Sequence, residues 1–377
     1  MRILVLANND IGLYNFRKEL LARLIKDGNE VYISLPEGDK VKPLEDMGLK
    51  LIDTQIDRRG INPITDIKLF ITYINIIKSV QPSVILTYTI KPNIYGSTAA
   101  RICGIPYLVN ITGLGTAFEN DGWLRHLISN MYKIALKRSN CVFFQNQKNR
   151  ETFEMYGLIS GNNRLLPGSG VNLDQFSVLE YPSNETLEFV FISRIMKEKG
   201  IDQYLECAEY IRKRYPNTRF HICGFCEEAY QKKLKELHDN GVIMYHGLLS
   251  DVREVLKVTH CTIHPSYHEG MSNVLLESSA SGRPCLCSDI PGCREIVNDG
   301  GTGFLFEPKR TESLINAVEK FIELPYDLKK QFGVNARRKV EKEFDRQIVI
   351  DAYMDEINKI SKGGIYNVLQ KFISRDT

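Results

Sequence analysis

Short apolar runs alternate with longer amphipathic stretches through the first half of the chain. The runs are RILVLA (2–7), EVYISLP (30–36), VILTY (84–88), YLVNIT (107–112) and CVFFQN (141–146). Between the first two lies YNFRKELLARLIKDG (14–28), whose apolar positions recur at helical spacing. Strands of five or six residues separated by helices are typical of a parallel, doubly wound sheet. The first half is therefore predicted to be an α/β domain.

The same alternation starts again in the second half. The later runs are EFVFIS (188–193), RFHICG (219–224), VIMYHG (242–247), CTIHPS (261–266) and PCLCSD (284–289). Residues 165–183 between the two series are rich in Gly, Pro and Ser, which indicates a linker. We predict one α/β domain over 1–168 and a second over 169–355, with a ligand at the carboxyl ends of the strands. A tail, 356–377, is predicted to break at the glycine pair 363–364.

Two helical stretches of the first half are unusually apolar. Residues 64–80 are apolar around most of their circumference. Residues 123–139 place apolar side chains on one stripe, with Arg125, Lys133, Lys137 and Arg138 outside it. Each helix could pack on the sheet, and the second could instead lie at an anionic bilayer surface.

Composition narrows the class of protein. A chain of 377 residues with 43% hydrophobic and 25% charged residues is typical of a soluble protein of two domains. Residues 1–170 carry 21 Lys and Arg against 15 Asp and Glu, whereas the remainder carries 28 against 31. The basic first half suits an anionic partner such as a lipid diphosphate or a membrane surface, and no nucleic-acid signature is present.

The compartment is predicted from the amino terminus and the cysteines. MRILVLANN reads as a first strand and not as a signal peptide, and no apolar run is long enough for a spanning helix. Nine cysteines, mostly within apolar strand patterns, indicate reduced thiols in a cytosol. Cys223 and Cys226 form a C-x-x-C sequence, but they lack the strand, motif and helix order of a redox domain.

Two carboxylates stand eight positions apart at Glu269 and Glu277, within HPSYHEGMSNVLLESSASGRPCLCSD (264–289). Eight helical steps span roughly 12 Å. The loop amides near Gly270, Met271 and Ser272 are expected at a helix N-terminus, which favours phosphate. Two carboxylates that accept from hydroxyls, with phosphate-binding amides between them, suit a sugar nucleotide, which has hydroxyls on both sides of a diphosphate. Alone, the spacing also fits one solvated loop carboxylate and one on a helix.

A second element, FISRIMKEKGIDQYLE (191–206), places Arg194 and Lys199 at the exit of an apolar strand. With the E-x7-E spacing, this R-x4-KG sequence resembles the donor site of retaining nucleotide-sugar glycosyltransferases of family 4. The resemblance implies the GT-B fold: two Rossmann-like doubly wound domains with an inter-domain cleft. It also implies that 1–168 binds the acceptor, that 169–355 binds the sugar donor, and that 356–377 returns to the first domain.

The amino-acid sequences of the first-domain loops resemble those of a subgroup that builds bacterial surface polysaccharides or lipid-linked oligosaccharides. The implied reaction moves a hexose or N-acetylhexosamine from a UDP-sugar to a polyprenyl-diphosphate-linked saccharide, with retention. The resemblance assigns catalytic roles to Glu269, Arg194 and Lys199. It assigns sugar-donor contacts to Gly270, Met271, Ser272, Asn273, Glu277 and Gly12. Acceptor contacts fall to Arg17, Arg58, Arg59, Lys91, Thr112 and Gly113.

The chain departs from the family pattern at two places. Many relatives have a His where NITGLG places Thr112, so the role of that His does not carry over. A single glycine, Gly12, replaces a common pair. Arg58, Arg59 and Lys91 could clamp a lipid diphosphate or be solvated loop charges. His264 and His268 flank the sugar-donor loop, and a His after a strand is more often structural.

No D-x-D sequence accompanies a strand of the second half, and Arg194, Lys199 and a helix N-terminus would supply positive charge. We therefore expect no metal and no cofactor other than the UDP-sugar co-substrate. The expected location is the cytoplasm, peripheral on the inner face of the membrane. Two alternatives remain, a UDP-sugar 2-epimerase of the same architecture and a non-catalytic sugar-nucleotide or lipid-binding protein. The sugar, the linkage and the acceptor stay open.

Overall fold

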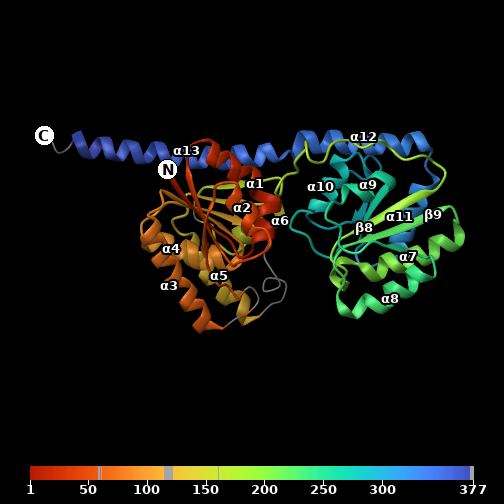
Figure 1. Cartoon of the computed structure of the whole chain (residues 1–377), viewed down its shortest axis with the longest axis horizontal. Coiled ribbons are helices and arrows are strands. Elements are labelled where there is room, and N and C mark those ends of the chain that lie inside the picture. Colours follow the sequence, from red (N-terminus) through yellow and green to blue (C-terminus); the bar gives the residue numbers. More distant parts are fainter. Residues whose placement is uncertain (58–59, 61, 114–121, 160, 374–377) are drawn as a thin grey trace. The chain divides into compact units, whose positions relative to one another are not determined.

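The computed structural model describes residues 1–373 apart from 58–59, 61, 114–121 and 160, and for 364–373 it describes the backbone alone. The chain forms two compact units. Unit 1 comprises Met1–Ser169 and the chain from Ile348 onward, and unit 2 comprises Gly170–Gln347. Each unit is a sheet with helices on both faces (Figure 1).

Unit 1 contains a parallel sheet in the order β3-β2-β1-β4-β5-β6-β7. Its strands are β1 (Arg2–Leu6), β2 (Glu30–Leu35), β3 (Lys50–Asp53), β4 (Val84–Tyr88), β5 (Tyr107–Ile111), β6 (Cys141–Phe144) and β7 (Asn163–Leu165). Its helices are α1 (Asp10–Lys26), α2 (Val41–Asp46), α3 (Pro63–Val80), η1 (Pro92–Gly96), α4 (Ser97–Ile102), α5 (Trp123–Leu136) and α6 (Gln147–Met155). The five strands predicted from apolar runs are all present, and the two edge strands β3 and β7 lie outside that series.

The core of unit 1 follows from alternation along its strands. Ile3 and Val5 of β1 point into a cluster on one face of the sheet, whereas Leu4 and Leu6 point into a cluster on the other. All four side chains are inaccessible to solvent. Because both faces are covered, the strands are almost continuously apolar, as expected for parallel sheets.

Unit 2 contains a parallel sheet in the order β10-β9-β8-β11-β12-β13. Its strands are β8 (Leu187–Ile192), β9 (Thr218–Cys223), β10 (Met244–Tyr245), β11 (Cys261–His264), β12 (Cys285–Ser288) and β13 (Gly303–Phe306). Its helices are η3 (Lys197–Lys199), α7 (Ile201–Arg214), α8 (Glu228–Asp239), α9 (Arg253–Val258), α10 (Asn273–Ala280), α11 (Thr311–Glu323) and α12 (Tyr326–Glu343). Phe189 and Phe191 of β8 join one core cluster, and Val190 and Ile192 join another.

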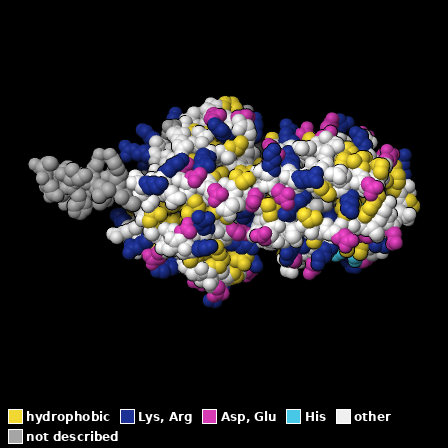
Figure 2. Space-filling view, turned by 90° about the horizontal axis from the view of Figure 1, so that it is seen from above, with side chains coloured by type: hydrophobic (Ala, Val, Ile, Leu, Met, Phe, Trp, Pro, Cys, Tyr) yellow, Lys and Arg dark blue, Asp and Glu magenta, His cyan; other side chains and the backbone are white. Residues whose placement is uncertain are grey.

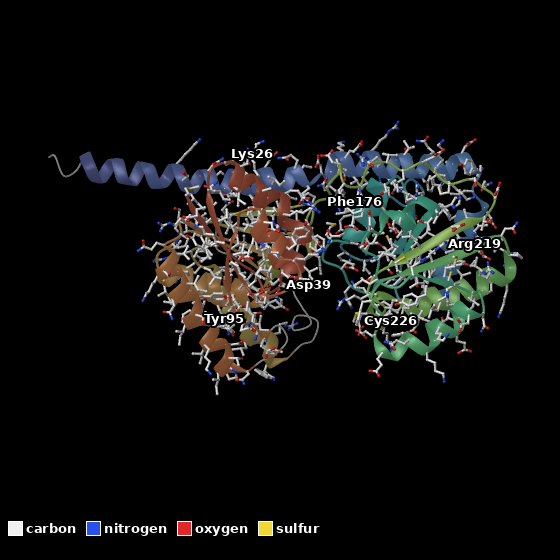
Figure 3. All side chains as sticks on the ribbon, in the orientation of Figure 1. Lys26, Asp39, Tyr95, Phe176, Arg219 and Cys226 are labelled. Atoms are coloured by element: carbon white, nitrogen blue, oxygen red, sulfur yellow. The ribbon has the colours of Figure 1, made fainter. Side chains whose placement is uncertain are left out.

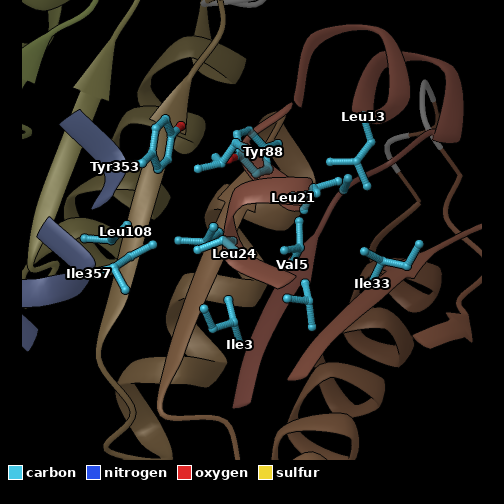
Figure 4. Close-up of a cluster of buried hydrophobic side chains, with 14 of the residues drawn as sticks. Ile3, Val5, Leu13, Leu21, Leu24, Ile33, Tyr88, Leu108, Tyr353 and Ile357 are labelled. Atoms are coloured by element: carbon cyan, nitrogen blue, oxygen red, sulfur yellow. The ribbon is translucent and has the colours of Figure 1, made fainter. Parts of the chain in front are cut away.

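The last helix, α13 (Arg346–Ile373), returns the chain to unit 1. Val349, Tyr353 and Ile357, spaced four residues apart, pack into the cluster that holds Ile3. Figure 4 shows Tyr353 and Ile357 among the side chains of this cluster. Burying side chains of this size stabilises a fold by roughly 1.5–3 kcal/mol each. The chain therefore rejoins unit 1 at Ile348, earlier than the predicted residue 356.

The predicted break at the glycine pair 363–364 is wrong, because α13 continues through it. Glycine lowers helix stability by about 1 kcal/mol relative to alanine, but it keeps the N–H that proline lacks. A glycine pair therefore does not interrupt the helical hydrogen bonds by itself.

Both apolar helices of the first half cover one face of the unit 1 sheet. Tyr73 of α3 and Tyr132 of α5 are buried in the same cluster. Each helix also keeps apolar side chains in solvent: these are Ile64, Ile67 and Ile71 on α3 and Trp123, Leu127 and Ile134 on α5. Trp123 is 71% exposed. Packing on the sheet therefore accounts for only part of the apolar surface of either helix.

Charged side chains of both signs are mixed on the surface that faces the viewer in Figure 2. Figure 2 shows Lys and Arg interspersed there with Asp and Glu. The basic excess of the first half is therefore not gathered into a single patch on this face.

Candidate functional site

The three predicted catalytic residues lie in unit 2, where the strand order of its sheet reverses. β8 and β11 are neighbours at the centre of the sheet, and the chain leaves them toward opposite sides. Arg194 and Lys199 follow β8, and Glu269 follows β11. In open α/β sheets the crevice at such a reversal, at the carboxyl ends of the strands, is the usual ligand site.

The two loops interlock at Gly200. This residue has φ 74°, and a Cβ on it would lie 2.0 Å from the carbonyl oxygen of Pro265. Only glycine combines this left-handed conformation with so close an approach. The glycine of the R-x4-KG sequence therefore allows the loop that carries Lys199 to pack directly on the loop that carries Glu269.

Glu269 is held at one oxygen by two side chains. Lys199 Nζ lies 2.6 Å and His264 Nε2 lies 2.9 Å from Glu269 Oε1. Burial alone would raise the pKa of this carboxyl. At the acid pH where it titrates, the hydrogen bond and charge of His264, followed by the charge of Lys199, lower its pKa to about 2. Glu269 is therefore ionised at neutral pH. No hydrogen bond from the described residues reaches its Oε2.

Ser272 begins α10 as its N-cap. Its Oγ accepts a hydrogen bond from the N–H of Leu275 at 3.4 Å. Its own N–H donates to the carbonyl of Gly292 at 2.9 Å, so it is not open to a phosphate as predicted. The first-turn N–H groups of Asn273 and Val274 lack acceptors within the helix and are better suited. The Met271 side chain is buried in the core.

Glu277 lies one turn further along α10, and no hydrogen bond or ion pair to its carboxyl is present in the described residues. Burial raises the pKa of Glu277 to about 7, and the nearest opposing charge is that of Arg346. The folded protein thus keeps a partly buried carboxyl poised near neutrality, which is typical of a functional site.

The loop after β12 packs closely against the backbone of the sugar-donor loop. A Cβ on Gly292, which has φ 85°, would meet the carbonyl oxygen of Gly270 at 2.7 Å. The N–H of Gly292 donates to Glu295 Oε2 at 2.7 Å. The carboxylate of Asp289 forms an ion pair with the guanidinium of Arg294 at 2.9 Å. This loop positions the backbone around Glu269.

The two predicted cations differ in their partners. Lys199 is half-buried in its ion pair with Glu269. Arg194 is exposed, and neither a hydrogen bond nor an ion pair to its side chain is found among the described residues. Arg194 is therefore free to bind an anionic ligand, whereas Lys199 offers only the donors that Glu269 leaves unused.

In unit 1, Gly12 and Arg17 are engaged within the protein. Asn9 is the N-cap of α1, and its Oδ1 accepts from the N–H of Gly12 at 2.6 Å. Arg17 is buried, its guanidinium lies 5.2 Å from the ring centre of Tyr88, and it donates to the carbonyl of Phe16. The Nε of Arg17 is buried and has no hydrogen-bond partner among the described residues. The ligand contacts expected of Gly12 and Arg17 stay predictions.

The remaining acceptor candidates are only partly described. Lys91 forms an ion pair with Asp66 at 2.6 Å. Tyr95, which is labelled in Figure 3, donates to the second oxygen of Asp66 at 2.9 Å. Lys91 is thus neutralised. Thr112 and Gly113 follow β5 and are half-buried. Arg58 and Arg59 lie outside the described residues.

The described residues show no arrangement for metal binding or for thiol redox chemistry. Within them, no cluster of three His, Cys, Asp or Glu side chains is arranged to hold a metal ion. Across the same residues, every helix is too short or too polar to cross a membrane. Burial raises the pKa of Cys223 to about 12, so the C-x-x-C sequence does not form a reactive thiol pair. Cys226 (Figure 3) lines a cavity of about 450 Å³ beside α8 that contains none of the predicted residues.

His264 is a site residue that the sequence analysis did not identify. Its neighbour His268 is exposed. His264 is instead buried against Glu269. The sequence did contain a signal for this contact. His264 is the last residue of β11 and precedes Glu269 by five residues, so the intervening loop can fold back and bring Glu269 to the His264 ring.

Two family models match the chain. Glycosyl transferases group 1 match residues 180–339, and glycosyl transferase 4-like proteins match residues 2–146. The first match contains the whole site of unit 2, and the second covers most of unit 1.

Among curated proteins, the chain is 25% identical to the N,N'-diacetylbacillosaminyl-diphospho-undecaprenol alpha-1,3-N-acetylgalactosaminyltransferase of Campylobacter jejuni, over 96% of this chain and 100% of the relative. It is 26% identical to the UDP-Gal:alpha-D-GlcNAc-diphosphoundecaprenol alpha-1,3-galactosyltransferase of Escherichia coli, over 69% of this chain and 71% of the relative.

Solved structures share the fold. A glycosyltransferase from Rickettsia africae superposes with a TM-score of 0.80 at 21% identity, over 96% of this chain and 98% of that one. HepE from Anabaena, in complex with UDP and glucose, superposes with a TM-score of 0.77 at 16% identity, over 95% and 99%. From its two matched domains, its paired Rossmann-like sheets and its relatives, the chain belongs to the family 4 glycosyltransferases of the GT-B fold.

Proposed function

We propose that this glycosyltransferase moves a hexose or N-acetylhexosamine from a UDP-sugar to a polyprenyl-diphosphate-linked saccharide, with retention of configuration and without a metal. The observation that carries the proposal is the ion pair of Lys199 with Glu269 beside the N-terminus of α10. Glu277, whose carboxyl pairs with none of the described residues, lies one turn further on. These groups offer acceptors for hydroxyls on either side of a place for phosphate.

Each part of a UDP-sugar then has a partner of suitable chemistry. The free oxygen of Glu269 accepts a hydrogen bond from a hydroxyl of the transferred sugar. The first-turn amides of α10 and the unpaired Arg194 bind the diphosphate. Glu277, once ionised, accepts from the ribose hydroxyls. Glu269 precedes the first turn of α10 and Glu277 follows it, so a carboxylate stands on each side of these amides in the chain.

Retention is supported by the names of the relatives. Both form alpha-1,3 linkages, and the Escherichia coli protein takes UDP-Gal. UDP-hexoses carry the sugar in alpha linkage, so an alpha product retains its configuration. The acceptor hydroxyl attacks the anomeric carbon from the face that the diphosphate leaves. The bond from that carbon to the phosphate oxygen breaks, and the departing phosphate takes the hydroxyl proton.

Charge stabilisation in the transition state falls to the protein. The diphosphate gains negative charge as the glycosidic bond breaks. Arg194, the unused donors of Lys199 and the positive end of the α10 dipole oppose that charge in a fixed arrangement. We therefore infer that neither a divalent ion nor a separate cofactor takes part, and that the UDP-sugar is the only co-substrate.

The lipid-linked acceptor and the membrane surface form the second part of the proposal. Both curated relatives are named for acceptors built on diphosphoundecaprenol. On α5, the exposed Trp123, Leu127 and Ile134 accompany the exposed Lys133, and the exposed Lys137 is the C-cap of the helix. α5 also contains no acidic residue. We infer that α5 docks on anionic lipid, peripherally at the inner face of the cytoplasmic membrane.

A direct assay tests the transferase. The purified chain is incubated with UDP-GalNAc, UDP-Gal, UDP-GlcNAc or UDP-Glc and a synthetic GlcNAc-diphosphate-polyprenol, and the anomeric configuration of the product is determined by NMR. We expect an alpha-linked product with one of these donors. A beta-linked product would contradict retention. Conversion of a UDP-sugar to its epimer without acceptor would identify a 2-epimerase, and tight binding without turnover would identify a binding protein.

A further inference from the structure

His264 is a buried side chain that contacts both ends of the sugar-donor loop, residues 269–272. It is the last residue of β11, and its Nε2 lies 2.9 Å from Glu269 Oε1 and 3.2 Å from Ser272 Oγ. Ser272 caps α10 through that same hydroxyl. The Nδ1 of His264 is buried and has no hydrogen-bond partner among the described residues.

The contacts fix which ring nitrogen carries a proton. A neutral ring with its proton on Nδ1 would turn the lone pair of Nε2 toward a carboxylate oxygen and bury an unpaired N–H. A neutral ring with its proton on Nε2 donates to Glu269, and so does the charged ring. In either state, therefore, Nε2 of His264 is the donor to Glu269.

Two donors on two elements then restrain one oxygen of Glu269. Lys199, from η3, and His264, from β11, both contact Oε1. A carboxylate fixed at one oxygen in this way has the orientation of its plane restricted, and only Oε2 is left to accept a hydrogen bond from a ligand.

We propose that His264 is a positioning residue for transfer: it holds Glu269 so that Oε2 meets a hydroxyl of the transferred sugar, and it ties this loop to the N-cap of α10. The proposal rests on the function proposed above, in which Glu269 contacts the sugar. His264 itself touches no substrate. Its effect should therefore fall on turnover more than on UDP binding, because α10 and Glu277 are left in place.

The chain offers matched variants for the test. His264→Leu removes the donor, whereas His264→Gln can restore an N–H near the position of Nε2. His260 is a buried His just before the other end of β11, where its ring contacts the backbone of Glu188 and Ser183. His260→Gln therefore controls for loss of a buried imidazole next to the same strand.

We expect His264→Leu to lower kcat on the order of tenfold to 100-fold, the usual effect of a misplaced catalytic group, with the UDP Kd changed by less than about threefold. His264→Gln should recover most of the loss, and His260→Gln should keep wild-type kcat. The acid limb of the kcat profile should move to higher pH in His264→Leu. The other groups that face Glu269, Lys199 and the Cys293 thiol, are unchanged in that variant.

Thermal unfolding and Glu269→Gln complete the experiment. Equal losses of kcat in His264→Leu and His264→Gln, each with a matching fall in Tm, would show that the role is structural and overturn the proposal. Wild-type kcat in His264→Leu alongside an impaired Glu269→Gln would overturn it alone. Wild-type kcat in Glu269→Gln would overturn both this proposal and the sugar-donor site on which it rests.

Discussion

Lys199 and Glu269 are separated by 70 residues, and their side chains meet at 2.6 Å. They come from the loops that follow the neighbouring central strands β8 and β11. The fold, and not local sequence, brings them together, because a parallel sheet aligns the carboxyl ends of its strands at one edge. Breaking this contact is therefore a test of the site as a whole.

Lys199→Ala should lower kcat/KM by about 10²- to 10³-fold, because it removes a restraint on Glu269 and a charge near the departing diphosphate. Steady-state kinetics with the sugar donor identified by the transfer assay measures the effect. Lys197→Ala is the matched control, since Lys197 lies in the same short helix η3 and is exposed. Equal kinetics in the two variants would remove Lys199 from the site.

Much of the fold could be predicted from apolar runs. The central strands β1 and β8 pack on both faces and contain the apolar runs ILVL (3–6) and FVFI (189–192). The edge strands β3 (KLID) and β7 (NRL) could not be recognised, because they are short and bury little of their surface. The break in the tail was overpredicted, since glycine weakens a helix without removing a hydrogen-bond donor.

The site was predictable in its residue types but not in its pairings. Glu269 and Lys199 stand out by spacing and context. Other candidate residues are engaged by groups that are distant in sequence. Asp66 neutralises Lys91, and the carbonyl of Gly292 accepts the hydrogen bond from the N–H of Ser272. Such contacts depend on how loops cross at a sheet edge, which a single sequence does not encode locally.

Glu277 should make UDP binding depend on pH. Because burial raises the pKa of this carboxyl to about 7, it is largely protonated below that pH and must ionise to accept from two ribose hydroxyls. Between pH 8 and pH 6 the Kd for UDP should rise by about tenfold more in the wild type than in Glu277→Gln. Calorimetry in buffers of different ionisation enthalpy should detect proton release on binding near pH 6.5. Equal pH dependence in both proteins would contradict this role.

The same carboxyl should reduce stability at high pH. Its pKa is 4.5 unfolded and about 7 folded, so the folded state binds the extra proton between these values. Stability from this group is therefore full below pH 4.5 and is lost as pH rises to 7, by up to roughly 3 kcal/mol. Glu277→Gln should raise Tm at pH 8 and have little effect at pH 4.5. Glu236→Gln, at an exposed acid of α8, should change neither value.

Turnover should be unaffected by metal chelation. Arg194, Lys199 and the N-terminus of α10 supply the positive charge that a divalent ion provides elsewhere, so activity in EDTA should match activity with added Mg²⁺ or Mn²⁺. Arg194→Ala should lower kcat by about 10²-fold in either condition. Loss of activity in EDTA, restored by one of these ions, would show that the cationic side chains are not sufficient.

Membrane docking through α5 makes a prediction about liposomes. Charges on a surface are screened over about 8–10 Å at physiological ionic strength, so cationic attraction to anionic lipid should weaken with salt. Flotation with liposomes that contain anionic lipid should recover the protein at low salt, and recovery should fall at high salt and in Lys133→Gln with Lys137→Gln. Trp123→Ser should also lower recovery, because it removes the most exposed apolar side chain of the helix. Met155→Ser on α6 is the matched control, since Met155 is 70% exposed in the same unit. Equal losses in the two serine variants would show that general surface hydrophobicity, and not α5, binds the lipid.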